Sequence, residues 1–155
     1  MLNLQDASNL IMTELDQAND LFIKKKFDDA IRKYAQILKK EPENLIVLNN
    51  MGYALSKLKK FNAALECYDK SLGIEPNDRI VMVNKISLFR KTGKTSEAIE
   101  VCDKLLEKNS DELIVLYHKL RLLKKLNMFE KSNEICNKIL NRYPSNAEVR
   151  NELIK

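Results

Sequence analysis

The stretch that decides the fold is KKFNAALECYDKSL, at residues 59–72. Thirty-four residues earlier, at residues 25–38, the chain reads KKFDDAIRKYAQIL, with the lysine pair, the phenylalanine, an alanine and a tyrosine at the same offsets. The same step leads to GKTSEAIEVCDKLL at residues 93–106 and to NMFEKSNEICNKIL at residues 127–140. Four in-phase copies without an insertion predict a chain built from one repeated unit.

Each copy carries residues of the same kind at the same offsets, and its apolar residues recur at spacings of three and four, which predicts amphipathic helices. The aligned columns are Phe27, Phe61, Thr95 and Phe129; Ala30, Ala64, Ala98 and Ser132; Tyr34, Tyr68, Cys102 and Cys136; Leu38, Leu72, Leu106 and Leu140; Pro42, Pro76, Ser110 and Pro144; and, upstream, Ala18, Gly52, Ile86 and Leu120. A unit this small buries its apolar face only against its neighbours, so the fixed period predicts stacked units.

This pattern resembles the tetratricopeptide repeat (TPR) family, whose unit of two antiparallel helices has the same length as the period here. The second copy fits best, with the small residue Gly52 followed by Phe61, Ala64, Tyr68 and Pro76. The resemblance covers residues 11–146, and departures such as Ile86 and Ser132 fall mainly in the last two copies. It implies an all-α fold, a right-handed α-solenoid of four antiparallel helix pairs with a C-terminal capping helix.

On this interpretation the chain is a single domain over residues 1–155, with repeats at 11–44, 45–78, 79–112 and 113–146. We expect helix N-caps where each copy ends, at Asn44, Asp78, Asp111 and Ser145. Ser145 and Glu148 form a capping-box pattern, which predicts one more helix at about residues 146–154. Residues 147–155 are therefore either a capping helix or the start of a truncated fifth repeat.

The composition is that of a folded helical protein rather than a membrane-spanning or secreted one. Of its 155 residues 45% are hydrophobic and 32% charged, with three glycines and three prolines. No apolar run is long enough to span a bilayer, and MLNLQDASNL does not have the pattern of a signal peptide. Three cysteines far apart, without a CxxC motif, suit a reducing compartment. The sequence predicts a cytoplasmic location.

No arrangement of residues predicts catalysis. His118 is the one histidine and has no sequence partner for a triad or a metal site. Cys102 and Cys136 fall in the column of Tyr34 and Tyr68, which predicts buried, unreactive thiols. The glycines form no phosphate-binding loop. We expect a protein that is not an enzyme, with no cofactor and no metal.

The resemblance implies that the first helix of each pair lines a concave groove that holds a peptide or a helix of a partner. Carried over copy by copy, it places an apolar column in that groove, consisting of Met12, Ile46, Ile80 and Ile114. The partner-binding residues that it implies are Asn19, Asn50, Tyr53, Lys57, Asn84, Ser87, Arg90, Lys91, Tyr117, His118, Arg121 and Lys124.

Cations gather at the ends of these first helices. All 27 lysines and arginines follow residue 22, and Lys57, Arg90, Lys91, Lys124 and Lys125 recur at two neighbouring offsets. Cations near a helix C-terminus complement the helix dipole, which is one explanation. The other is recognition of acidic groups on a partner segment that also carries apolar anchors.

Some TPR co-chaperones grip a C-terminal carboxylate with two asparagines and three basic residues. Asn19 and Asn50 occupy the positions of those asparagines, whereas Leu15, Ile80 and Asn84 occupy the positions of the cations. Without charge-assisted hydrogen bonds the clamp loses its selectivity, so we do not expect it here. Amide side chains still suit a sequence-tolerant grip on an extended peptide backbone.

Two alternatives remain open from the sequence. Uncovered ends of the solenoid could stack into a homo-oligomer. Less favoured is RNA binding through the basic end of the groove, with Tyr53 and Tyr117 stacking on bases, because the acidic first copy opposes it. We expect a protein or peptide partner and no membrane.

Overall fold

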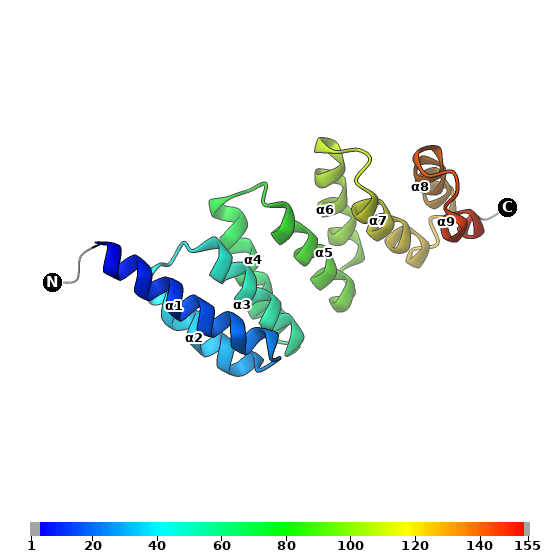
Figure 1. The fold of residues 1–155 in the computed structure, drawn as a ribbon. Coiled ribbons are helices and arrows are strands. Elements are labelled where there is room, and N and C mark those ends of the chain that lie inside the picture. Colours follow the sequence, from blue (N-terminus) through cyan, green and yellow to red (C-terminus); the bar gives the residue numbers. More distant parts are fainter. Residues whose placement is uncertain (1–3, 154–155) are drawn as a thin grey trace. The chain divides into compact units, whose positions relative to one another are not determined.

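The computed structural model describes the backbone of residues 4–153 and the side chains of residues 13–153. Within that range the chain is helical and contains no strand, which confirms the all-α prediction (Figure 1). The helices are α1 (Leu4–Ile23), α2 (Phe27–Lys40), α3 (Leu45–Lys57), α4 (Phe61–Ile74), α5 (Arg79–Thr92), α6 (Thr95–Lys108), α7 (Leu113–Lys125), α8 (Phe129–Arg142) and α9 (Ala147–Glu152). None of these described helices is both long and apolar enough to cross a membrane.

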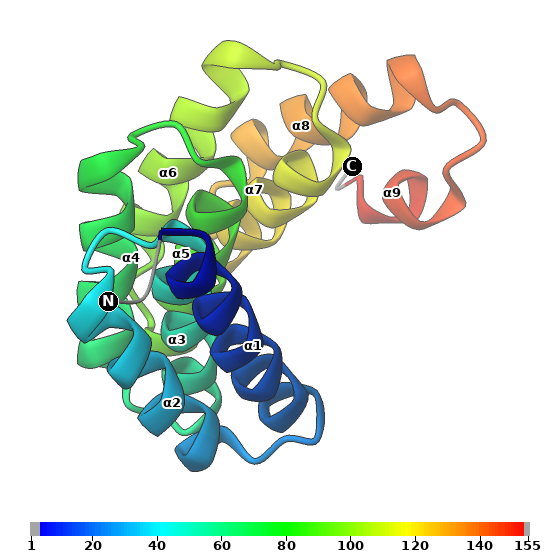
Figure 2. The ribbon, with the colours of Figure 1, turned by 60° about the vertical axis from the view of Figure 1, so that its left-hand side comes forward.

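The chain divides into two compact units, Met1–Val81 (unit 1) and Met82–Lys155 (unit 2). In unit 1, α1 packs on α2, α2 on α3 and α3 on α4; in unit 2, α6 packs on α7, α7 on α8 and α8 on α9. Figure 2 shows α1 and α2 running in opposite directions from the turn that joins them. The repeat boundaries and the single domain over residues 1–155 stay predictions.

The turn inside each helix pair is built in the same way in all four copies. Its central residue has a left-handed backbone conformation, with φ of 59° at Lys25, 60° at Lys59, 76° at Gly93 and 56° at Asn127. The next amide donates to the carbonyl five residues earlier, as in Lys60 N to Leu55 O at 2.9 Å and Lys94 N to Phe89 O at 2.9 Å. This is the Schellman arrangement, which ends one helix and reverses the chain. The lysine pair that opens residues 59–72 is therefore the turn itself.

Only the third copy uses glycine at this left-handed position, so we expect Gly93→Ala to lower the free energy of unfolding by about 1 kcal/mol. A Cβ at Gly93 meets nothing within 4 Å, so the cost comes from the backbone alone. Gly73→Ala is the matched control, since Gly73 lies in helical α4 with equally open space. It should stabilise by about 0.5 kcal/mol through helix propensity. Urea unfolding of both variants measures the difference, and equal effects would contradict the turn geometry.

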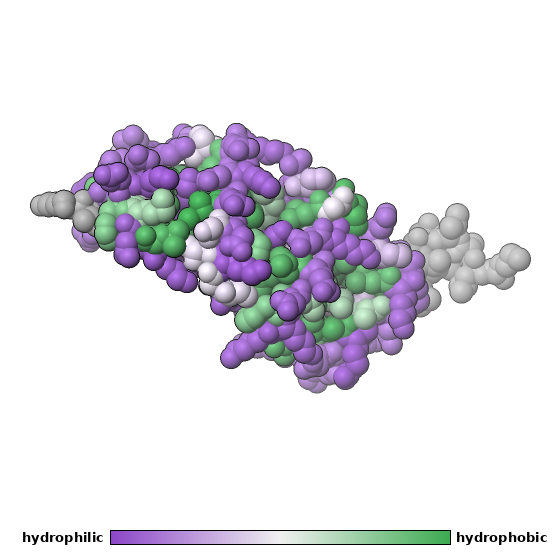
Figure 3. All heavy atoms as spheres, turned by 180° about the vertical axis from the view of Figure 1, so that it is seen from behind, coloured by the Kyte–Doolittle hydropathy of each residue, from purple (hydrophilic) through white to green (hydrophobic). Residues whose placement is uncertain are grey.

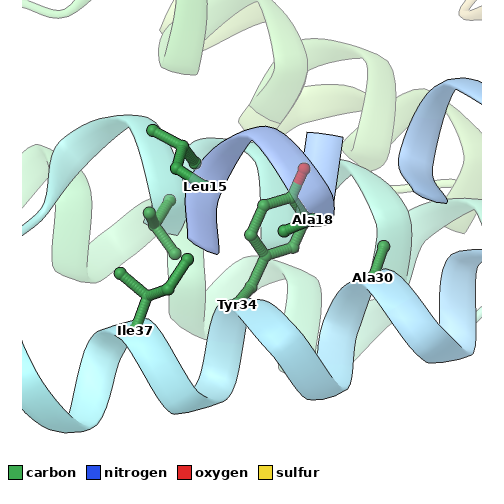
Figure 4. Close-up of a cluster of buried hydrophobic side chains, with 6 residues drawn as sticks. Leu15, Ala18, Ala30, Tyr34 and Ile37 are labelled. Atoms are coloured by element: carbon green, nitrogen blue, oxygen red, sulfur yellow. The ribbon is translucent and has the colours of Figure 1, made fainter. Parts of the chain in front are cut away.

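The two helices of a pair approach closely where a small residue faces a tyrosine. A Cβ on Gly52 in α3 would lie 2.7 Å from Cε1 of Tyr68 and 3.2 Å from Cβ of Cys67, both in α4. In the first pair, Ala18 and Tyr34 are fully buried, and Figure 4 shows Leu15 and Ala18 of α1 facing Tyr34 and Ile37 of α2. The helix crossing thus requires a small residue at Gly52, and Ala18 is fully buried at the same offset of the first pair.

We expect Gly52→Val to destabilise unit 1 by about 2 kcal/mol, because the buried Tyr68 ring has no room to yield. Thermal unfolding followed by circular dichroism measures the loss. The same substitution at the exposed Gly73 should change stability by less than about 0.5 kcal/mol. A tolerated valine at position 52 would show that α3 and α4 do not cross as closely as described.

Two of the predicted helix N-caps are confirmed and two are wrong by one residue. Asn44 Oδ1 accepts from Val47 N at 3.1 Å, and Asp78 Oδ1 accepts from Val81 N at 3.1 Å. The caps of α7 and α9 are Glu112 and Asn146 instead of Asp111 and Ser145. The observed caps are spaced by the repeat length, so the fixed length of the loop between helix pairs sets the cap position. Glu112 occupies this position although its side chain makes no capping hydrogen bond.

The last helix is shorter than the predicted 146–154 and does not use the Ser145–Glu148 capping box. Asn146 Oδ1 caps α9 by accepting from Val149 N at 3.0 Å. Val149 is fully buried in a cluster that α7 and α8 form with Leu116, Leu120, Cys136 and Ile139. Six residues cannot hold a helix alone, so α9 exists because this cluster receives it.

Candidate functional site

The first helix of each pair keeps one face free of the core. In α3 this face carries Ile46, Asn50, Tyr53 and Lys57, at spacings that bring them to one side of the helix. The isoleucine that begins the face recurs, with exposed fractions of 60% at Ile46, 60% at Ile80 and 55% at Ile114. Figure 3 shows a face of the molecule on which hydrophilic side chains predominate and apolar atoms gather in smaller patches. Among the exposed large hydrophobic residues of the described side chains, Ile46, Ile80 and Ile114 share one offset of the repeat.

In unit 1 the two predicted asparagines hold each other and a buried tyrosine. Asn19 Oδ1 accepts from Tyr34 Oη at 2.7 Å and from Asn50 Nδ2 at 3.1 Å. Burial raises the pKa of Tyr34 to about 12, against the opposing effect of a hydrogen bond with Asn50, so the phenol remains a donor. This network joins α1, α2 and α3 and fixes the amides beside the exposed face.

At the C-terminal ends of α1 and α3 lies a cavity of about 370 Å³, here called the aromatic pocket. Its lining residues are Phe22, Ile23, Lys25, Phe27, Tyr53 and Lys57. The Phe22 ring lies 5.4 Å from the Tyr53 ring and 5.7 Å from the Phe27 ring, between centroids. Lys57 Nζ lies 4.9 Å from the centre of the Tyr53 ring, within the range of a cation–π interaction.

In unit 2 a cavity of about 460 Å³, here called the basic pocket, lies between α5 and α7. It is lined by Ser87, Arg90, Lys91, Arg121 and Lys125. Four of these residues are in the predicted set, and Lys125 joins them. The structure thus brings together, within one unit, cations that are about 30 residues apart in the sequence.

A neutral histidine orients one of these cations. Arg90 Nη1 lies 3.0 Å from His118 Nδ1. Because arginine only donates, Nδ1 must accept, which places the imidazole proton on Nε2. Burial lowers the pKa of His118, and the positive charges of Arg90 and Arg121 lower it further.

Three predicted residues lie against α9. Tyr117 Oη accepts from Asn146 Nδ2 at 2.6 Å, and Lys124 Nζ donates to the Glu152 carbonyl at 2.9 Å and to its carboxylate. Arg121 Nη2 lies 3.9 Å from Glu148 Oε1. Tyr117 and Lys124 therefore help to dock α9. Asn84, the remaining predicted residue, is half-buried on α5.

The thiols are poor nucleophiles. Cys102 and Cys136 are fully buried, as predicted, and burial raises the pKa of both, to about 12 for Cys102. Cys67 is half-buried, and burial followed by the charge of Glu66 raises its pKa to about 11. Across the part of the chain that the structure describes, no group of three or more His, Cys, Asp or Glu side chains could hold a metal ion.

Sequence reasoning did not single out Phe22, Ile23, Lys25 and Phe27 as site residues. Phe22 and Ile23 stand at the groove offsets of Arg90 and Lys91, which placed them on the groove side, although they are not among the predicted binding residues. Lys25 and Phe27 belong to the turn, and only the folded pair brings them to α3.

A family model, the tetratricopeptide repeat, matches residues 46–78. No curated protein matches the sequence. Among solved structures, a TPR protein from Parabacteroides merdae ATCC 43184 is 22% identical with a TM-score of 0.84, covering 90% of this chain, which spans 56% of that one. MamA of Desulfovibrio magneticus RS-1 is 18% identical with a TM-score of 0.81, covering 92% of this chain and 81% of its own.

A third structure, the first TPR of Spaghetti (RPAP3) bound to the HSP90 peptide SRMEEVD, is 19% identical with a TM-score of 0.70. The match covers 76% of this chain and 93% of that one. At these identities the likeness shows the fold, which is that of TPR proteins. Within it, residues 46–78 are recognisable as a tetratricopeptide repeat from their sequence as well.

The His118 imidazole should titrate below the ordinary histidine pKa of 6.5. Arg90→Gln removes a positive neighbour, so the pKa should rise, while Lys104→Gln on the exposed face of α6 should leave it unchanged. With a single histidine in the chain, one proton NMR titration reads it directly. Because the folded-state pKa is depressed, stability should fall as the pH drops below 6.5, where the unfolded chain binds the proton more readily. A wild-type pKa at or above 6.5 would contradict this geometry.

Proposed function

We propose that this TPR-fold chain is a non-catalytic protein-interaction module, an adaptor or scaffold, which binds a peptide or helix of a partner on its first helices. The observation that carries the proposal is the exposed isoleucine at the same offset of three first helices. Each begins a face that continues with amide, hydroxyl, aromatic or cationic side chains. Repeat packing has no need of an exposed isoleucine, whereas a partner segment with apolar anchors does.

The basic pocket is the proposed recognition site for acidic groups of that partner. Arg90, Lys91, Arg121 and Lys125 supply its charge. The Arg121–Glu148 pair, at 3.9 Å with side chains 59% and 65% exposed, is too long and too exposed to neutralise Arg121 strongly. An arginine held by His118 presents its remaining donors to a carboxylate, which favours charge-assisted hydrogen bonds.

The helix dipole does not explain this cluster fully. Lys91 and Lys125 lie in the last turns of α5 and α7, where a cation is stabilised by about 0.3–1 kcal/mol. Arg121 lies before the last turn of α7, outside the reach of that effect. Its place in the pocket supports ligand binding as the reason for the shared position.

The carboxylate clamp of co-chaperones remains excluded from the proposal. Leu15 is buried and Ile80 exposed where the clamp has cations, and Asn19 and Asn50 bond each other. The similar structure bound to the HSP90 peptide SRMEEVD therefore supports peptide binding as a role, but it does not imply that this chain binds the same peptide. That peptide should bind no more tightly than a scrambled version of it.

Selection from a random peptide library displayed on phage tests the proposal. We expect enrichment of acidic peptides with apolar residues, and salt-sensitive binding of the selected peptides. Lys91→Glu combined with Lys125→Glu should weaken that binding about tenfold or more, and should lower the melting temperature no more than the control pair does.

The matched control reverses two exposed cations of the last turns of other helices, Lys39→Glu with Lys108→Glu. It changes net charge and helix-dipole interactions equally, so it should leave affinity within about twofold. Fluorescence anisotropy measures both variants. Equal losses in the two, or a library without acidic enrichment, would overturn acidic recognition by the basic pocket.

A further inference from the structure

The aromatic pocket and the basic pocket occupy the same place in the repeat. Phe22, Ile23, Tyr53 and Lys57 of the aromatic pocket precede Arg90, Lys91, Arg121 and Lys125 of the basic pocket by two repeat lengths each. Both cavities lie at the C-terminal ends of two first helices. The same position in the repeat is thus lined mainly by aromatic and aliphatic side chains in unit 1 and by basic side chains in unit 2.

We propose that the aromatic pocket is an anchor site for an apolar side chain, aromatic by preference, that lies next to a carboxylate in a partner's peptide segment. This inference rests on the proposed function and names the chemistry that unit 1 recognises. All lining residues of the aromatic pocket belong to unit 1.

The apolar residues of this pocket are not required by the repeat. At the offset of Phe22 the other copies carry Ser56, Arg90 and Lys124, and at the offset of Ile23 they carry lysine. Those copies form their helix pairs without an apolar residue there. Phe22 packs partly against the core of unit 1, but Ile23 is 76% exposed at the last residue of α1.

The rings form walls around the cavity rather than a closed core. Phe22 meets Phe27 edge-to-face, with planes at 72°, and meets Tyr53 at 59°. Tyr53 remains 36% exposed. An inserted apolar side chain would remove these ring faces and Ile23 from water together, which is the main source of affinity for such a cleft.

The charge at the pocket selects the neighbour of that side chain. Its lining includes two cations, Lys25 and Lys57, and no acidic residue. Lys25 is held at the turn by its left-handed backbone, and Lys57 Nζ lies over the Tyr53 ring. A carboxylate beside the inserted side chain would meet both ammonium groups at the edge of the cavity.

Titration of the isotope-labelled full chain with N-acetyl-L-phenylalanine, which carries a ring and a carboxylate, tests the site by NMR. We expect saturable shifts at the amides of Phe22, Lys25, Tyr53 and Lys57. N-acetyl-L-phenylalanine amide, without the charge, should bind there more weakly. N-acetylglycine, without the ring, should not saturate these shifts.

Two variants separate the apolar part from the charged part. Ile23→Ser should weaken both aromatic probes about fivefold, whereas Ile74→Ser, at the exposed last residue of α4 in unit 1 and outside the pocket, should weaken neither. Lys57→Gln should lower the affinity of N-acetyl-L-phenylalanine towards that of its amide, with Lys25 still contributing, and leave the amide unaffected.

Absence of saturable shifts at these amides, or equal effects of the two serine variants, would overturn the anchor site. If the probes bind as expected but phage selection yields no peptide ligand, the pocket stands and the proposed interaction role fails. If peptides are selected but the probes do not bind, the role stands and this inference fails.

Discussion

The contact between Gly52 and the Tyr68 ring sets how closely the two helices of the second pair cross. The ring occupies the space that any side chain at position 52 would fill, so α3 and α4 cross at a distance that only a minimal residue permits. The left-handed turn at Lys59 delivers the chain into this crossing, and its hydrogen bond from Lys60 to Leu55 ends the first helix at a fixed point. The turn recurs in all four copies, whereas the residue at the crossing changes from alanine or glycine to Ile86 and Leu120 in the last two.

The two helices of a pair therefore have different roles. The second helix of a pair directs its tyrosine or cysteine into the core, as Tyr34, Tyr68, Cys102 and Cys136 do, all of them buried. The first helix keeps a face outside this core, on which helical spacing brings Ile46, Asn50, Tyr53 and Lys57 to one side. Binding chemistry can therefore vary on the first helices without disturbing the fold.

The two pockets illustrate that freedom. At the same offsets, unit 1 carries phenylalanine, isoleucine and tyrosine, and unit 2 carries arginine and lysine. The replacement costs little stability because these positions are partly or largely exposed in both units. A repeat scaffold of this kind can present an apolar anchor site and an acid-binding site from a single architectural plan, and we propose that this chain does so.

The sequence by itself determined the helix pairs and the buried columns, because the period of 34 residues records where each chain segment must turn and pack. Strict use of that period would also have placed the caps at Glu112 and Asn146 rather than at their neighbours. Only the tertiary structure decided which groove candidates are engaged elsewhere. Lys124 and Tyr117 lie at groove offsets, but Lys124 is hydrogen-bonded to Glu152 of α9, and Tyr117 is hydrogen-bonded to Asn146, the N-cap of α9.

The aromatic pocket likewise depended on tertiary structure. Lys25 and Phe27 come from the turn and the start of α2, and Tyr53 comes from α3, so no local pattern joins them. The period fixes what each copy contributes to its own core, since that packing is repeated and local. The period does not predict contacts that occur in one copy alone, such as those between α7 and the segment of α9. Those contacts decide which exposed side chains remain available to a partner.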